Sequence, residues 1–200
     1  MNFIKFKETF KNQIFIKSSM IKNFFPNFDL KNLTNWQKKW YIIKLRKWFY
    51  IFSDLEINEK ILYKIANNLN EPSYIWLQSA LNFYSIIPEW VFTITSISTK
   101  RINFLQTKIW NFKYFTIKKD LFFGYSVKNW FFVSDLEKTV LDFLYFYPKY
   151  RQVEDFKELR FNKEILKENL DLQKMEKYLK IFNNKQLEKR FNNLKQYIYA

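Results

Sequence analysis

Side chains that donate and accept hydrogen bonds are concentrated in the first quarter of the chain. Residues 30–39 repeat apolar positions at helical spacing, with Leu30, Leu33 and Trp36 on the predicted buried face. Six of the remaining positions carry the ammonium, amide and hydroxyl groups that we expect to read base edges in the major groove of DNA. They are Lys31, Asn32, Thr34, Asn35, Lys38 and Lys39.

Two further groups of side chains flank this predicted helix and are suited to contacts with phosphates. The upstream group can act from the start of the preceding helix, and the downstream group can follow the DNA backbone or enter the minor groove. These are Ser18, Ser19 and Lys22 upstream, and Lys44, Arg46 and Lys47 downstream. The alternative for every one of these residues is a solvated, charged surface, which is common in Lys-rich chains.

The elements expected around these side chains follow the order helix, helix, helix, hairpin. Apolar spacing predicts the helices, and runs of β-branched and aromatic residues predict the strands. The helices are 3–10, 20–25 and 30–39, and the strands are 41–44 and 49–52. Pro26 can end the second helix, and Asp29 can cap the third. This order is typical of a winged helix-turn-helix, which we expect over residues 1–53.

Charge is unevenly distributed along the chain. The 200 residues carry a net charge of +15. Residues 1–53 hold 11 basic and 2 acidic side chains and therefore account for +9 of it. An AT-rich gene would explain abundant Lys, Asn, Ile and Phe, but it would not gather the charge at one end. A localised positive field is typical of a protein that binds a polyanion.

The rest of the chain predicts a mixed α/β domain over residues 54–200, with a small sheet in 54–146 and helices in 147–200, so the fold class is α+β. Helices are expected over 57–69, 74–84, 135–146, 153–160, 163–170, 172–182 and 185–197. Strands are expected over 91–97, 101–105, 112–117, 122–127 and 131–133.

Several classes of chemistry are excluded by composition. The chain has no Cys and no His, which removes thiolate or imidazole metal sites and a Ser-His-Asp triad. Asp135, Glu137 and Asp142 cluster near a predicted helix start, where a carboxylate more simply offsets the helix dipole. No Gly-rich phosphate loop is visible. We therefore expect no catalytic residue, metal or cofactor, and no enzyme.

The chain carries no apolar run of transmembrane length, and its first residues are too polar for a signal peptide. A cytoplasmic protein without a membrane partner is expected.

Four blocks of sequence together resemble one family. They are WQKKWYIIKLRKWFYIFSD from Trp36, ANNLNEPSYIWLQSALNFYSIIPEWVFTITSISTKR from Ala66, Tyr114 with Phe123-Gly124-Tyr125, and DLEKTVLD from Asp135. In this order and spacing, over roughly residues 15–160, they are similar to the AbiEi-type antitoxins.

This resemblance implies the antitoxin of a type IV toxin–antitoxin (abortive infection) system. The N-terminal winged helix would bind double-stranded DNA at its own promoter, as a monomer or a dimer, and repress its operon. The functional partner would be an AbiEii-like nucleotidyltransferase toxin, without a tight complex. Three alternatives stay open: a generic winged-helix transcriptional regulator, a basic module that binds RNA or an acidic protein without a toxin partner, and a nuclease or transferase with a carboxylate site.

Tryptophan occupies several positions where the AbiEi pattern has glycine. The chain has one Gly and seven Trp. Trp40 follows the third predicted helix, Trp48 closes the hairpin turn, Trp110 precedes a strand, and Trp130 follows Asn129 where Asn-Gly is the strongest hairpin signal. One hypothesis is that UGA codons read as glycine were translated as Trp; the other is that these are genuine tryptophans of an aromatic core. Trp76 and Trp90 are weaker candidates, and Trp36 fits as Trp.

Overall fold

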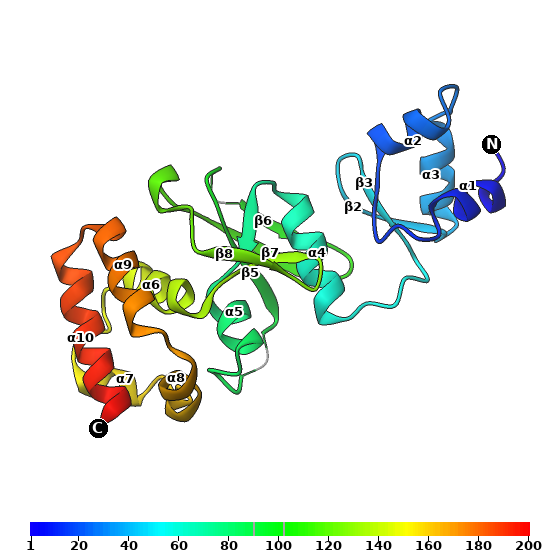
Figure 1. Ribbon diagram of the computed structural model, residues 1–200. Coiled ribbons are helices and arrows are strands. Elements are labelled where there is room, and N and C mark those ends of the chain that lie inside the picture. Colours follow the sequence, from blue (N-terminus) through cyan, green and yellow to red (C-terminus); the bar gives the residue numbers. More distant parts are fainter. Residues whose placement is uncertain (90, 102) are drawn as a thin grey trace.

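The computed structural model describes residues 1–89, 91–101 and 103–200. This part of the chain is α+β, with ten α-helices, a small sheet and a larger mixed sheet. The large sheet lies between the N-terminal elements and the C-terminal helices (Figure 1). Trp90, a weaker glycine candidate, and Ile102, inside the predicted strand 101–105, lie outside the described residues.

The N-terminal elements alternate helices with three short strands. The predicted helices and hairpin are present, and a two-residue strand, β1, adds to them. Antiparallel pairing gives the order β1-β3-β2. The elements are α1 (Phe3–Phe10), β1 (Ile16–Lys17), α2 (Ser18–Phe24), α3 (Lys31–Lys38), β2 (Ile42–Arg46) and β3 (Phe49–Phe52).

A compact aromatic core holds these elements together. Phe6 and Phe10, four residues apart on α1, are buried against Leu33 and Trp36 of α3. The Phe6 and Trp36 rings lie 4.7 Å apart. Leu30, expected to face inward, is instead 39% exposed because it precedes the first turn of α3.

The large sheet has the order β6-β7-β5-β4-β9-β8. The pairs β5–β7 and β4–β9 are parallel and the other pairs are antiparallel. The strands are β4 (Ser73–Ile75), β5 (Thr93–Ser98), β6 (Asn103–Gln106), β7 (Asn111–Thr116), β8 (Tyr125–Lys128) and β9 (Phe131–Ser134).

The predicted helix over 74–84 was wrong in its first part. Residues 73–75 form β4, and the helix α5 (Leu77–Phe83) begins afterwards. This strand is buried on both faces, and a short buried apolar run has the same sequence pattern in either structure. Tyr74 packs into the cluster of the C-terminal helices, whereas Ile75 packs into the cluster under α4 (Glu59–Leu69).

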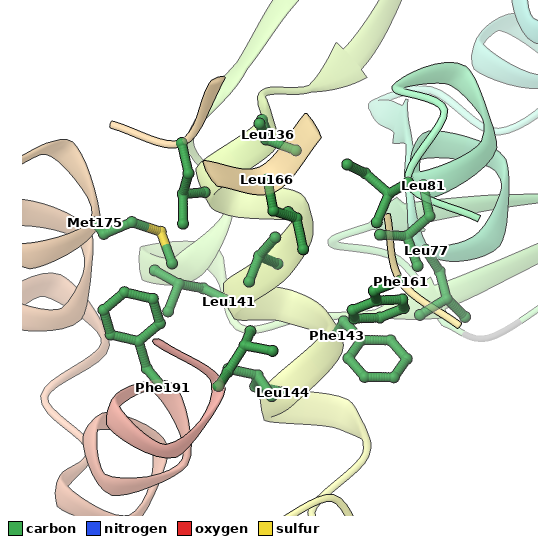
Figure 2. Close-up of a cluster of buried hydrophobic side chains, with 14 of the residues drawn as sticks. Leu77, Leu81, Leu136, Leu141, Phe143, Leu144, Phe161, Leu166, Met175 and Phe191 are labelled. Carbon is green, nitrogen blue, oxygen red and sulfur yellow. The ribbon is translucent and has the colours of Figure 1, made fainter. Parts of the chain in front are cut away.

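The C-terminal helices pack around α6. Leu141 and Leu144 of α6 converge with Met175 and Phe191 from two later helices in a continuous apolar cluster (Figure 2). The helices are α6 (Leu136–Phe146), α7 (Val153–Lys157), α8 (Lys163–Asn169), α9 (Leu172–Phe182) and α10 (Lys185–Tyr199). None of the helices in the described residues combines the length and apolar character needed to cross a bilayer.

Apolar side chains of the small sheet also belong to a second cluster, which includes residues of α4 and the large sheet. Leu45, Phe49 and Ile51 of the hairpin are buried in the same cluster as Leu62 and Ile65 of α4. In Figure 1 the hairpin lies between the N-terminal helices and the rest of the molecule. The N-terminal elements are therefore attached to the large sheet by packing as well as by the chain.

Candidate nucleic-acid interface

The third helix, α3, places its predicted DNA-reading side chains on its outer face. Leu33 and Trp36 are buried, as the periodicity predicts, and this orients the opposite face toward solvent. Five of the six candidate residues are exposed: Lys31, Thr34, Asn35, Lys38 and Lys39. The sixth, Asn32, is half-buried, and its side chain donates a 3.0 Å hydrogen bond to the carbonyl of Asp29.

The start of α2 lies beside the hairpin turn. The Ser18 backbone N–H donates a 3.1 Å hydrogen bond to the carbonyl of Trp48. Ser19 and Lys22 are exposed, whereas Ser18 is half-buried. The structure thus brings the upstream candidates close to the end of the hairpin, where the downstream candidates Lys44, Arg46 and Lys47 lie.

The three basic residues of the hairpin differ in their surroundings. Lys44 and Lys47 are exposed. Arg46 is also exposed overall, but its guanidinium donates a hydrogen bond to the main-chain carbonyl of Leu69, at the end of α4. Arg46 therefore has a partner within the protein, which its sequence context did not reveal.

Acidic partners are distributed so that the candidate DNA-binding surface stays positively charged. Lys7, Lys11 and Lys17, none of them a candidate DNA-binding residue, pair with Asp54, Glu8 and Glu71 at 2.5, 3.2 and 2.9 Å. Within the described part of the chain, no ion pair involves the lysines of the candidate surface, which are Lys22, Lys31, Lys38, Lys39, Lys44 and Lys47. Unpaired ammonium groups on one side of a domain create the local field that attracts phosphates.

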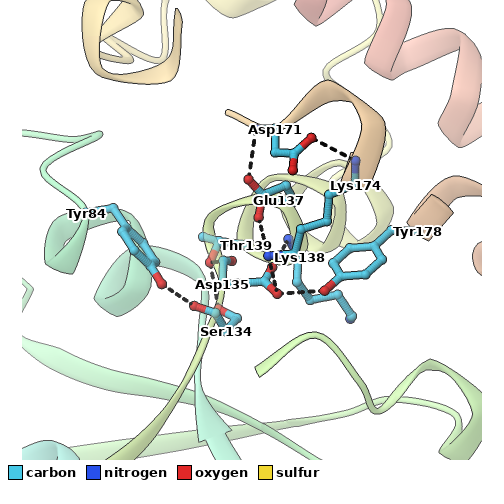
Figure 3. A network of polar contacts seen from close by, with 9 residues as sticks. All are labelled: Tyr84, Ser134, Asp135, Glu137, Lys138, Thr139, Asp171, Lys174 and Tyr178. Carbon is cyan, nitrogen blue, oxygen red and sulfur yellow. Dashed lines mark hydrogen bonds and ion pairs between the residues drawn. The ribbon is translucent and has the colours of Figure 1, made fainter. Parts of the chain in front are cut away.

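The carboxylates near residue 135 form a structural network instead of an open site (Figure 3). Asp135 caps α6 by accepting a 2.8 Å hydrogen bond from the Lys138 N–H, as expected for a first-turn carboxylate. Its other oxygen accepts from the Tyr178 hydroxyl at 2.7 Å and pairs with Lys174 at 3.0 Å. Glu137 also pairs with Lys174, at 2.8 Å.

A fully buried ion pair continues this network into the core. Lys138 and Asp142, one turn apart on α6, contact each other with no exposed surface, and the Tyr74 hydroxyl lies 3.2 Å from both. Burial lowers the pKa of Lys138 and raises the pKa of Asp142 to about 6, because it penalises the charged form of each. Each of these groups already has protein partners, and the described residues contain no cluster of three or more acidic side chains able to hold a metal.

Comparison with protein-family models finds no match to this chain, and neither does comparison with curated proteins.

Proposed function

We propose that residues 1–53 form a winged helix-turn-helix that binds double-stranded DNA. The observation that carries this proposal is the outer face of α3, where exposed polar and basic side chains have no acidic partner in the described structure. In a helix-turn-helix the second helix of the pair enters the major groove, and here that helix is α3. The hairpin of β2 and β3 would be the wing.

The order of elements supports the same assignment. The strand β1 stands between α1 and α2 and pairs with β3, so the sheet closes one side of the three helices. Lys44 and Lys47 of the hairpin and Lys22 of α2 are suited to contacts with the backbone, whereas Asn35 is suited to contacts with base edges. The major groove is wide enough to admit an α-helix such as α3.

We further propose that the chain is a type IV antitoxin that represses its own operon and counteracts an AbiEii-like nucleotidyltransferase toxin. This step rests on the resemblance of the sequence blocks beginning at Trp36, Ala66 and Asp135. In the structure the first block covers the end of α3 and the hairpin, and the last covers the start of α6 with its buried pair. The resembling sequence blocks thus include strands of both sheets.

The DNA-binding proposal is tested with the full chain and a labelled duplex from upstream of its own gene. Fluorescence anisotropy at several salt concentrations should show binding that weakens as salt rises. The triple variant Lys31→Ala/Lys38→Ala/Lys39→Ala should lose most of this affinity. Its matched control, Lys177→Ala/Lys185→Ala/Lys195→Ala, removes the same charge from exposed C-terminal positions and should bind nearly as the parent does.

Two outcomes would contradict the proposal. Absence of binding at low salt would defeat it outright. Equal losses in the two triple variants would mean that net charge, and not the α3 surface, drives binding. Competition with single-stranded RNA of the same length separates the alternative of an RNA-binding module, since RNA would then displace the duplex more effectively than unlabelled DNA does.

The antitoxin proposal has its own readout. A neighbouring gene for a nucleotidyltransferase-like protein is expected, and inducing that gene alone should stop growth. Co-expression of the full chain should restore growth. The triple variant on α3 should still restore growth while losing operon repression, because the resemblance assigns repression to residues 1–53 and neutralisation of the toxin to the AbiEi-like antitoxin domain, residues 54–200. No rescue by the folded parent chain would refute the antitoxin role and leave DNA binding standing.

A further inference from the structure

Three tryptophans occupy backbone conformations that favour glycine. Among the described residues, eight residues other than glycine have positive φ, and Trp supplies three of them although it makes up 7 of 200 residues. They are Trp40, Trp48 and Trp130, with φ of 57°, 65° and 71°. Left-handed backbone is sterically unfavourable for a bulky residue and is the usual reason for placing glycine.

Trp40 stands at the glycine position of a Schellman motif. The helix α3 ends at Lys38 with Lys39 as its C-cap, and the Trp40 N–H donates to the carbonyl of Gln37 at 3.1 Å. The next N–H, of Tyr41, donates to the carbonyl of Trp36 at 2.9 Å. This pair of hydrogen bonds defines the motif, whose C′ residue has positive φ and is most often Gly.

The other two tryptophans lie in two-residue hairpin turns. Asn129 and Trp130 join β8 to β9, and both have positive φ, as in a type I′ turn. Asn-Gly is the preferred sequence for that turn. Trp48 occupies the second position of the turn between β2 and β3, immediately before Phe49. All three positions are therefore explained by known turn geometry in which glycine is the favoured residue.

The side chains at these positions contribute little to the core. Trp40, Trp48 and Trp130 are 63%, 45% and 82% exposed, whereas Trp36 and Trp76 are 6% and 0% exposed. Trp36 and Trp76 have negative φ and pack against other aromatic rings. Trp110, expected to share the glycine-like backbone, does not have positive φ, so the geometric evidence does not extend to it.

From this coincidence of residue type, turn geometry and exposure, we propose that positions 40, 48 and 130 are glycine in the protein made by its native cell. Each would be encoded by UGA and inserted as glycine there, although the same codon reads as tryptophan in some other genetic codes. Trp36 would be encoded by UGG, since its ring is part of the N-terminal core.

The gene sequence and the native protein together test this proposal. UGA codons at 40, 48 and 130, and UGG at 36, are expected. Peptides from the native protein should show at each of the three positions the mass of glycine, and the mass of tryptophan at 36. UGG or a tryptophan mass at any of the three positions would overturn the proposal for that position.

A recombinant comparison gives a second, independent readout. The variant Trp40→Gly/Trp48→Gly/Trp130→Gly should unfold at a higher urea concentration than the chain with tryptophan, since backbone strain is relieved at three turns. The control Trp36→Gly should unfold at a clearly lower concentration because it empties part of the aromatic core. A lower midpoint for the triple variant would contradict the assignment of these turns to glycine.

An independent observation concerns a buried arginine near the C-terminus. Arg190 of α10 is only 8% exposed, and its Nε has no hydrogen-bond partner. Within the described part of the chain no carboxylate pairs with it. A buried charge without a partner is energetically costly, and a bound ligand of opposite charge would remove that cost.

Arg190 lines a pocket of about 510 Å³ between α10 and the segment 148–152 that precedes α7. The pocket wall contains two further cations, Arg151 and Lys189, and no carboxylate. Its other polar residues are amides, which include Gln186 and Asn193. Asp155, the nearby acid, is already engaged by the N–H groups of Arg151 and Gln152 at 2.8 Å each.

The electrostatics of the pocket favour an anion. Burial is the largest influence on the pKa of Arg190 and lowers it. The positive charge of Arg151 lowers this pKa further. Two like charges held together in one wall are relieved by a negatively charged ligand. A guanidinium binds a phosphate or carboxylate through two parallel hydrogen bonds, and three cations in one pocket match the multiple charge of phosphate.

We infer that this pocket binds a phosphate group, carried either by inorganic phosphate or by a small phosphomonoester such as a nucleotide. Arg190 would make the central contact, and Arg151 and Lys189 would complete the charge. The site lies in the C-terminal helices and is separate from the α3 surface.

Thermal unfolding of the full chain, titrated with inorganic phosphate against chloride of equal ionic strength, tests this inference. Phosphate should raise the melting temperature of the parent in a saturable way, since a ligand bound to the folded state stabilises it. Arg190→Met should abolish that increase and, without phosphate, should unfold at the same or a higher temperature because the unpaired charge is gone. Lys195→Ala, on the same helix but outside this pocket, should behave as the parent does.

Further titrations identify which molecule carries the phosphate group and which results would overturn the inference. AMP that stabilises at lower concentration than phosphate, with no effect of adenosine, would assign the pocket to a nucleotide. Equal potency of AMP and phosphate would assign it to the phosphate group alone. No increase beyond that of chloride, or an Arg190→Met variant that keeps the full increase, would overturn the inference.

Discussion

Arg46, in the hairpin of the N-terminal sheet, donates a hydrogen bond from its guanidinium to the main-chain carbonyl of Leu69 at the end of α4. A second link lies beside it, where Lys17 pairs with Glu71 at 2.9 Å. Polar contacts therefore reinforce the apolar packing between the small sheet and the end of α4.

This arrangement separates the roles of the three basic hairpin residues. Replacing Lys44 and Lys47 with Ala should lower the salt slope of DNA binding by about 1 to 2, because each lysine that contacts a phosphate releases about one counterion. Arg46→Ala should leave the slope unchanged but reduce the unfolding midpoint. Anisotropy across a salt series and urea unfolding measure the two effects. A reduced slope in Arg46→Ala alone would show that this guanidinium binds DNA instead.

Asn35 is expected to contribute to sequence preference. Its side chain is exposed at the centre of α3, and an amide of this kind contacts adenine through two hydrogen bonds. Asn35→Ala should weaken binding to the promoter duplex by about 1 to 3 kcal/mol and leave binding to random DNA unchanged. Lys39→Ala, as the control, should weaken both equally. Equal losses on both duplexes in Asn35→Ala would contradict base recognition by this residue.

The buried pair on α6 should be far more sensitive to half-removal than to full replacement. Asp142→Asn leaves the Lys138 ammonium without its counter-ion and should lower the free energy of unfolding by about 3 to 5 kcal/mol. The double variant Lys138→Met/Asp142→Leu removes both charges and should lie close to the parent. Urea unfolding at neutral pH distinguishes the two. A double variant as unstable as Asp142→Asn would mean that the pair itself stabilises the fold.

The same pair predicts a pH dependence of stability. The folded state raises the pKa of Asp142 to about 6, from 3.8 ordinarily, so between these values it retains a proton that the unfolded chain releases. The free energy of unfolding should therefore fall as pH rises from about 4 to 6, by on the order of 3 kcal/mol. The measurement is the difference between the parent and Lys138→Met/Asp142→Leu at each pH. A difference that does not change over this range would refute the predicted shift.

Gly124 should be intolerant of a side chain. Its φ is +68°, and a Cβ would lie 2.9 Å from the Cβ of Lys138. Gly124→Ala should lower the free energy of unfolding by about 1 to 3 kcal/mol, since backbone strain and a steric contact coincide. Ser126→Ala, on the exposed strand β8 that follows, is the matched control and should change little. Equal stability of the two variants would contradict this account.

Local structure followed closely from the sequence where the pattern extended over several turns. The helix over 172–182 was predicted to the residue, and the helix over 3–10 likewise. The strands β1 and β4 were missed because two or three residues carry too little periodicity to separate strand from helix or loop. The parallel pairing of β5 with β7 depends on contacts distant in sequence, which no local pattern encodes.

The exposed face of the candidate site could be predicted from helical spacing, but the contacts within the protein that involve its residues could not. Helical spacing of Leu33 and Trp36 placed the polar residues of α3 on the outside. The same spacing gave no sign that Arg46 contacts Leu69, because the two residues belong to different elements that are distant in the sequence. Arg190 was overlooked because a single arginine in a Lys-rich helix resembles its exposed neighbours until burial is known.

The cluster that Leu45, Phe49 and Ile51 share with α4 has a consequence for how this protein can be altered. A fragment ending near residue 53 would carry three bare apolar side chains on its sheet and would tend to aggregate. The N-terminal segment 1–53 is therefore poorly suited to grafting onto other proteins. A chimera that joins residues 1–53 to another protein would fold only if that protein supplied a surface shaped like that of α4.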